Sequence, residues 1–282
     1  MFEWNLLVLI IIIAVGIGLL AALFGIGGGF LLVPTMILIV ELDTHLTVGT
    51  SSFVIIFMAL SSSIAYARQK RIDYKTTMIL MIASLIGSVI GAWATELVSG
   101  QFILVSFGIV EALLATILAV KKTPSELENI TNITKNEGKW YILQRHHIDS
   151  EETEYNYSAN ILLAFPFAFL AGFLSSLLGI GGGTLYIQIF VFICGMSIHM
   201  AIASSIFTIL FSSIASAVTF ITMEQVQFTV GIIYAIGVVF GAQLGAYISK
   251  KIEAKKLKKL AAIMIIIIAI RMIVFALIEN PV

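Results

Sequence analysis

Long apolar runs separated by short polar loops make up most of the chain. A helix needs about 20 residues to cross a hydrocarbon core of about 30 Å. Runs of about this length are 6–24, 46–67, 76–98, 102–120, 161–178, 200–221, 228–249 and 260–278. Two further runs, 30–40 and 184–194, reach only about half of the core. This pattern predicts an all-α integral membrane protein.

Each short run follows a glycine-rich turn, and the two turns are copies of each other. The sequence of residues 25–29, Gly-Ile-Gly-Gly-Gly, returns at residues 179–183, an offset of 154 residues. The same offset matches His45 to His199, Ser51 to Ser205, Phe53 to Phe207, Gly87 to Gly241 and Gly91 to Gly245. A register kept over so long a stretch indicates an internal duplication. We expect two repeats, 1–120 and 159–282, each a glycine-broken helical hairpin followed by three transmembrane helices.

The composition indicates a membrane protein, and the placement of its charges suggests an orientation. The chain is 60% hydrophobic and 11% charged, with a mean hydropathy of +1.07, values that exclude an ordinary soluble domain. All Lys and Arg residues except Arg271 lie within 68–75, 121–145 and 250–259. The positive-inside rule places these loops in the cytoplasm and both termini outside the cell membrane. Corresponding loops of the two repeats then face opposite sides, which predicts inverted-topology repeats.

The segment 121–158 is polar and rich in Asn, Glu, Lys and Thr. We interpret it as a cytoplasmic linker and a solvated connector. The alternative is that its short patch 140–143, Trp-Tyr-Ile-Leu, seats a small strand or a regulatory contact.

The repeated residues resemble the signature of the sulfite exporter TauE/SafE family of membrane anion transporters. That signature is a glycine-rich turn, an apolar stretch and a His-x-Ala-x-x-Thr-Ser-like segment, here 45–51 and 199–205. The resemblance covers nearly all of the chain outside the linker. The departures are Thr47 in place of Ala, Ser204 in place of Thr, and Gln188 at the position that matches Pro34. The resemblance implies transport of small sulfur-containing or organic anions, with a substrate that differs among members.

The glycine turns are the predicted substrate site. A helix N-terminus offers free N–H groups and the positive end of a dipole to an anion, and glycine lets the backbone approach it closely. Hydroxyls in the next span can complete the shell of hydrogen bonds around the anion, although they can instead bond within their own helix or serve helix packing. The expected substrate-binding residues are Gly27, Gly28, Gly29, Phe30, Thr50, Ser51, Gly181, Gly182, Gly183, Thr184, Ser204 and Ser205.

Four titratable side chains complete the set of candidate site residues. Arg271 and Glu111 fall near the middle of apolar runs, where a lone charge is costly. We expect Arg271 to be the counter-charge of the substrate and Glu111 to couple protons; the alternative is a structural ion pair between them. His45 and His199 begin equivalent spans and are expected to gate or couple transport, or else to cap a neighbouring chain end.

These features predict a secondary transporter of small oxyanions, preferably sulfur-containing, that works by alternating access around the two glycine turns. The alternatives are a proton-coupled carrier of small carboxylates and a metal or cation carrier, the latter disfavoured by the lack of a Cys/His cluster. An intramembrane hydrolase is less favoured because the chain has no Gly-x-Ser-Gly turn. We expect no enzyme activity, cofactor, metal or nucleic-acid partner. The expected partners are a small anion and the bilayer, with a homodimer left open.

Overall fold

The computed structural model describes residues 4–120, 140–150, 152–249 and scattered positions between 251 and 274. The first half contains α1 (Trp4–Phe24), α2 (Gly29–Leu38), α3 (Thr44–Arg68), α4 (Tyr74–Ala94), the 3-10 turn η1 (Thr95–Leu97) and α5 (Gly100–Val120). The second half contains α6 (Ile161–Leu178), α7 (Gly183–Gln188), the π-helical turn η3 (Ile189–Ile193), α8 (Ile198–Thr222) and α9 (Phe228–Ser249).

The structure confirms a mostly helical, multi-span membrane protein. In the described part of the chain six helices are long and apolar enough to cross a membrane, namely α1, α3, α4 with η1, α6, α8 and α9. The helices at the short runs, α2 and α7 with η3, are short as predicted. The last predicted run, 260–278, falls mostly outside the described residues.

The long and the short helices begin in different ways. Side chains cap the long ones: Asp43 accepts from the N–H of His45 at the start of α3, and Ser197 accepts from that of Met200 at the start of α8. The short helices α2 and α7 follow the N-cap residues Gly28 and Gly182, which have φ of 78° and 68° and make no side-chain cap. Only glycine adopts such angles at little cost, so both helix breaks depend on their glycines.

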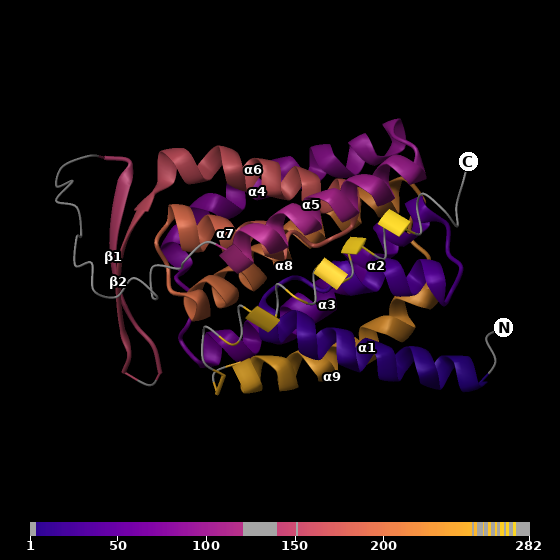
Figure 1. The fold of residues 1–282 in the computed structure, drawn as a ribbon, viewed down its shortest axis with the longest axis horizontal. Coiled ribbons are helices and arrows are strands. Elements are labelled where there is room, and N and C mark those ends of the chain that lie inside the picture. Colours follow the sequence, from indigo (N-terminus) through magenta and orange to yellow (C-terminus); the bar gives the residue numbers. More distant parts are fainter. Residues whose placement is uncertain are drawn as a thin grey trace.

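The two halves interlock (Figure 1). Helix α1 packs along α9, and α4 packs along α6. Glycines make both contacts close, because a Cβ on Gly241 would overlap the carbonyl of Val15, and one on Gly87 would overlap that of Phe169. Small residues allow such close approach between membrane helices. Each repeat therefore contributes one helix to each contact.

The loops gather at two opposite ends of the bundle. At one end Gln225 donates its amide to Glu96 at 3.5 Å, and a Cβ on Gly100 would lie 3.0 Å from Thr44. At the other end His199 contacts the carbonyl of Ile252 at 3.3 Å. The described parts of the basic loops 68–75 and 250–259 lie at this second end, the end that carries the strands in Figure 1.

The linker contains an antiparallel β-hairpin, which corrects its interpretation as a solvated connector and adds strands to the all-α prediction. Strand β1 (Ile142–Ile148) pairs with β2 (Glu154–Asn160). In β2 the residues alternate so that Tyr157 and Ala159 are buried, the period expected of a strand. Strand β2 runs past the predicted boundary at 158, and the segment 121–139 lies outside the described residues.

Candidate functional site

The two glycine turns lie against each other inside the bundle, and every residue of both turns is buried. A Cβ on Gly27 would lie 3.3 Å from the carbonyl of Gly181, and one on Gly181 would lie 3.0 Å from the oxygen of Gly27. A Cβ on Gly29 would overlap Ile180, and one on Gly183 would overlap Ile26. The first residue of each short helix therefore abuts the turn of the other half.

Helix α2 presents unpaired N–H groups at this contact. Leu31 and Leu32 donate to the carbonyl of Gly28 at 3.0 and 2.9 Å. The N–H groups of Gly29 and Phe30 have no hydrogen-bond acceptor among the described residues. Free N–H groups at the positive end of a helix dipole are suited to an anion. In the second half Tyr186 donates to the carbonyl of Gly182 at 2.9 Å, so α7 starts in the same way.

Two of the predicted hydroxyls reach across to the opposite turn. Ser51 in α3 donates to the carbonyl of Gly179 at 3.0 Å, and Ser205 in α8 donates to that of Gly25 at 3.1 Å. Each hydroxyl also lies 2.9 Å from a carbonyl of its own helix. The structure thus brings these two serines together with the glycine turns.

The neighbouring hydroxyls have other partners. Thr50 accepts from the N–H of Gln227, just before α9, at 2.9 Å, and Ser204 accepts from the N–H of Asp73, just before α4, at 3.4 Å. Each hydroxyl thus accepts a hydrogen bond from the residue directly before a long helix of the opposite half. Thr184, in the first turn of α7, is buried.

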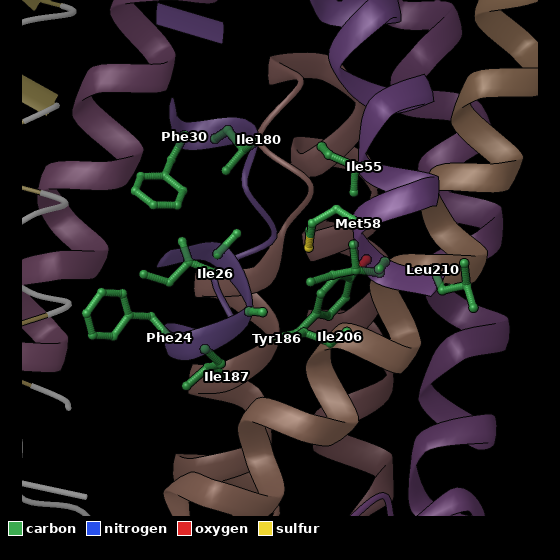
Figure 2. Close-up of a cluster of buried hydrophobic side chains, with 14 of the residues drawn as sticks. Phe24, Ile26, Phe30, Ile55, Met58, Ile180, Tyr186, Ile187, Ile206 and Leu210 are labelled. Carbon is green, nitrogen blue, oxygen red and sulfur yellow. The ribbon is translucent and has the colours of Figure 1, made fainter. Parts of the chain in front are cut away.

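Large apolar side chains from both halves surround the turns. In Figure 2 Phe30 lies beside Ile180, and Tyr186 lies between Met58 and Ile206. All five side chains are buried. A polar group in such surroundings interacts more strongly with a dipole than it would in water, so the N–H groups of the turns act in a setting that favours anion binding.

The predicted titratable residues lie apart from the turns or outside the described part. His45 is half-buried at the start of α3, and its Nδ1 has no partner among the described residues. His199 lies at the opposite end of the bundle, beside Ile252. The side chain of Glu111 and all of Arg271 fall outside the described residues, so their roles stay predictions.

The sequence did not reveal a buried carboxylate, Asp73, in the loop before α4. Its side chain accepts from Arg145 at 3.0 and 2.7 Å and from Thr76 at 2.8 Å, and also from the Tyr157 hydroxyl. Burial by itself would raise the pKa of Asp73, but these hydrogen bonds outweigh it and lower the pKa to about 2. Asp73 is therefore ionised at neutral pH. Its place before an apolar run was the only sequence signal, and it indicates no more than a helix cap.

The β-hairpin binds both halves through this carboxylate. Arg145 and Tyr157 are cross-strand partners, and both contact Asp73 of the first half. Tyr157 also lies against the second half, since a Cβ on Gly195 would be 3.8 Å from that of Tyr157. The hairpin therefore bridges the halves at the end that carries the basic loops.

A group of hydroxyls beside the second glycine turn was also missed. Ser84 in α4 and Tyr186 in α7 are joined by a hydrogen bond between their hydroxyls. Ser175 in α6 lies beside Gly182. A comparison of the two repeats position by position could have found these residues, because their counterparts Val238, Leu32 and Ala21 are apolar.

The known proteins that this chain resembles are described as membrane transporters or exporters. The model of a family described as sulfite exporter TauE/SafE matches residues 10–272. The chain is 30% identical to the probable membrane transporter protein YunE of Bacillus subtilis, over 94% of this chain and 97% of that protein. It is 28% identical to the probable membrane transporter protein MJ0441 of Methanocaldococcus jannaschii, over 91% and 92% of the two chains. No solved structure matches the chain.

Proposed function

Because the chain belongs to the sulfite exporter TauE/SafE family of membrane transporters, we propose that it is a secondary transporter of small oxyanions, with sulfur-containing anions such as sulfite as the first candidates. The names of the family and of the relatives indicate a transporter rather than an enzyme. The observation that carries the proposal is the contact between two buried glycine turns, at least one of which offers unpaired helix N–H groups.

The two halves are proposed to be inverted repeats. Their contacts recur with the halves exchanged: Gly87 packs on Phe169 as Gly241 packs on Val15, and Ser51 bonds Gly179 as Ser205 bonds Gly25. An exchange of this kind is what a twofold axis produces. The basic loops from both halves lie at one end, which supports a cytoplasmic location for that end and an axis in the membrane plane.

Alternating access follows from the contact between the turns. Gly29 and Gly183 each abut the opposite turn, so an anion reaches the N–H groups only when the halves move apart at the turns. The same movement breaks the hydrogen bonds from Ser51 and Ser205, and these hydroxyls become donors to the anion. In this proposal Arg271 supplies a counter-charge, Glu111 couples protons, and His45 and His199 act at opposite ends of the path.

Binding to purified protein tests the proposal. A ligand that binds only the folded state stabilises it by about 2.7 kcal/mol at 100 times its Kd. We expect sulfite, sulfate, thiosulfate or a small carboxylate to raise the melting temperature above that in chloride at equal ionic strength. A response to carboxylates alone would favour the carboxylate carrier, and no response to any of these anions would contradict the proposal.

A pair of glycine variants ties the binding to the turns. In Gly28→Ala the new Cβ would lie 3.3 Å from that of Ala21 and 3.5 Å from Met58 Cε, and alanine is strained at the φ of 78°, so the variant alters the turn and fills space beside it. We expect a weaker response to anions in this variant. Gly16→Ala is the matched control, because its Cβ would have no atom within 4 Å. An equal response in both variants would remove the first turn from the site.

A further inference from the structure

The two glycine turns have different surroundings, although the repeats are copies. Five buried hydroxyl side chains gather beside the second turn, those of Ser84, Ser88, Ser175, Tyr186 and Ser212. They come from four helices, α4, α6, α7 and α8. The Tyr186 hydroxyl is hydrogen-bonded to that of Ser84, whereas the hydroxyls of Ser88 and Ser212 donate to the carbonyls of Gly172 at 3.4 Å and Ile209 at 3.1 Å.

This cluster reaches the glycine turn itself. A Cβ on Gly182 would lie 2.8 Å from Ser175 Cβ, 2.9 Å from Ser175 Oγ and 2.8 Å from Tyr186 Cε2. Gly182 is the N-cap residue, directly before α7. The hydroxyl cluster and the start of α7 are therefore parts of one buried polar region.

The five matching positions of the first half are apolar. The positions equivalent to Ser84, Ser88, Ser175, Tyr186 and Ser212 are Val238, Ala242, Ala21, Leu32 and Met58. Three of these surround Gly28 as their counterparts surround Gly182, since a Cβ on Gly28 would lie 3.3 Å from Ala21, 3.5 Å from Met58 and 3.8 Å from Leu32. The same packing is thus achieved without hydroxyls, so helix contact alone does not require the polar cluster.

We propose that the anion binds against the second glycine turn, and that Ser84, Ser175 and Tyr186 are the side chains that determine its specificity. This inference rests on the proposed transport function and deepens it. Hydroxyls donate hydrogen bonds to an oxyanion without placing a full charge in the membrane. A site that used both turns equally would keep the hydroxyls in both halves. Hydroxyls beside one turn alone place the anion nearer to the second turn than to the first.

The test compares two buried tyrosines whose hydroxyls each contact a serine. Tyr186→Phe and Ser84→Ala remove hydroxyls of the proposed site. Tyr66→Phe is the matched control, because the Tyr66 hydroxyl bonds the Ala22 carbonyl at 2.7 Å and Ser249 at 3.0 Å, outside this cluster. Each protein is titrated with sulfite, sulfate and acetate while its melting temperature is followed.

We expect Tyr186→Phe and Ser84→Ala to weaken the apparent affinity for the stabilising anion at least tenfold, and Tyr66→Phe to leave it unchanged. A merely structural cluster would lower the melting temperature without anion but not the affinity, and that result would overturn the inference. If wild-type protein responds neither to these three anions nor to thiosulfate, the proposed function fails and the inference fails with it. A response that persists in both site variants overturns the inference alone.

Discussion

At the scale of single residues, two serines connect the halves where the glycine turns meet. Ser51 and Ser205 each donate to a carbonyl of the opposite turn. Those carbonyls are buried, so water cannot replace a lost donor, and an unsatisfied buried acceptor costs about 1–3 kcal/mol. The serines therefore stabilise the closed contact between the turns, and the same bonds must break when the turns separate.

Ser51→Ala and Ser205→Ala should each lower the unfolding free energy by about 1 kcal/mol, because each leaves a turn carbonyl without its donor. Ser52→Ala is the control, since the Ser52 hydroxyl bonds the Val48 carbonyl of its own helix at 3.0 Å. Thermal unfolding of the three purified variants measures the difference. Equal stabilities for Ser51→Ala and Ser52→Ala would show that the bond across the halves contributes nothing.

At the scale of elements, glycines set how closely the helices approach. In α1 a Cβ on Gly18 would overlap the carbonyl of Val238 in α9, whereas one on Gly16 would meet no atom within 4 Å. Gly172 of α6 has the same relation to Ser84 of α4. The helix contacts thus depend on glycine at particular positions and tolerate a side chain at others nearby.

Gly18→Ala should destabilise the protein by about 1–3 kcal/mol, since the added methyl group forces α1 and α9 apart. Gly16→Ala should be neutral or stabilising by up to about 1 kcal/mol, because alanine favours a helix. The two positions share one helix, so they form a matched pair in a denaturation experiment. A loss of stability in Gly16→Ala as large as that in Gly18→Ala would contradict this account of the α1–α9 contact.

The ion pair of Arg145 with Asp73 is one of several contacts that dock the β-hairpin, together with Arg71 and Asp149 at 3.8 Å and His147 and the Lys70 carbonyl at 2.7 Å. Arg145→Gln should weaken the docking of the hairpin on Asp73, which keeps its contact with the Tyr157 hydroxyl, because a hydrogen bond to a charged group contributes about 1.5–3 kcal/mol. The chain's single cysteine, Cys194, reports the weakening: it is buried and precedes Gly195, which lies against Tyr157. We expect maleimide to modify Cys194 roughly tenfold faster or more in Arg145→Gln, as local opening becomes easier.

The control for this experiment is His146→Gln, on the same strand. The His146 side chain is 54% exposed and pairs with the exposed Glu154 at 3.6 Å, so its loss should leave Cys194 protected. Nanodiscs keep both membrane faces reachable, which makes the result independent of topology. If Cys194 reacts equally fast in wild-type protein and in Arg145→Gln, the ion pair does not hold the hairpin.

At the scale of the whole molecule, the proposed inversion fixes which loops share a side of the membrane. Single cysteines at Lys75 and Lys256, in a Cys194→Ala background, should be labelled from the cytoplasmic side of the cell membrane, and one at the exposed Leu97 from the outside. All three positions are exposed. Labelling of positions 75 and 256 from opposite sides would contradict the inverted arrangement, because these loops come from different repeats.

Local patterns in the sequence determined the elements. The length of an apolar run decides whether a helix can cross the membrane, and a glycine run after it marks where a helix must break. Both signals come from residues adjacent in the sequence. The structure has helices at the apolar runs that it describes. The duplication also identified the two glycine turns, which meet in the structure at Gly27 and Gly181. A small strand at 140–143 was only the alternative, and the hairpin itself was not predicted because the alternation in Glu154–Asn160 is short and polar.

Only the tertiary structure decided which distant residues become partners. Asp73 and Arg145 are separated by 72 positions, and Ser84 and Tyr186 by 102, so no local periodicity relates them. The duplication likewise did not indicate that Thr50 and Ser204 would hold helix starts while Ser51 and Ser205 reach the turns. A hydroxyl bonds whichever acceptor the packed helices place within about 3 Å, and that placement depends on the whole bundle.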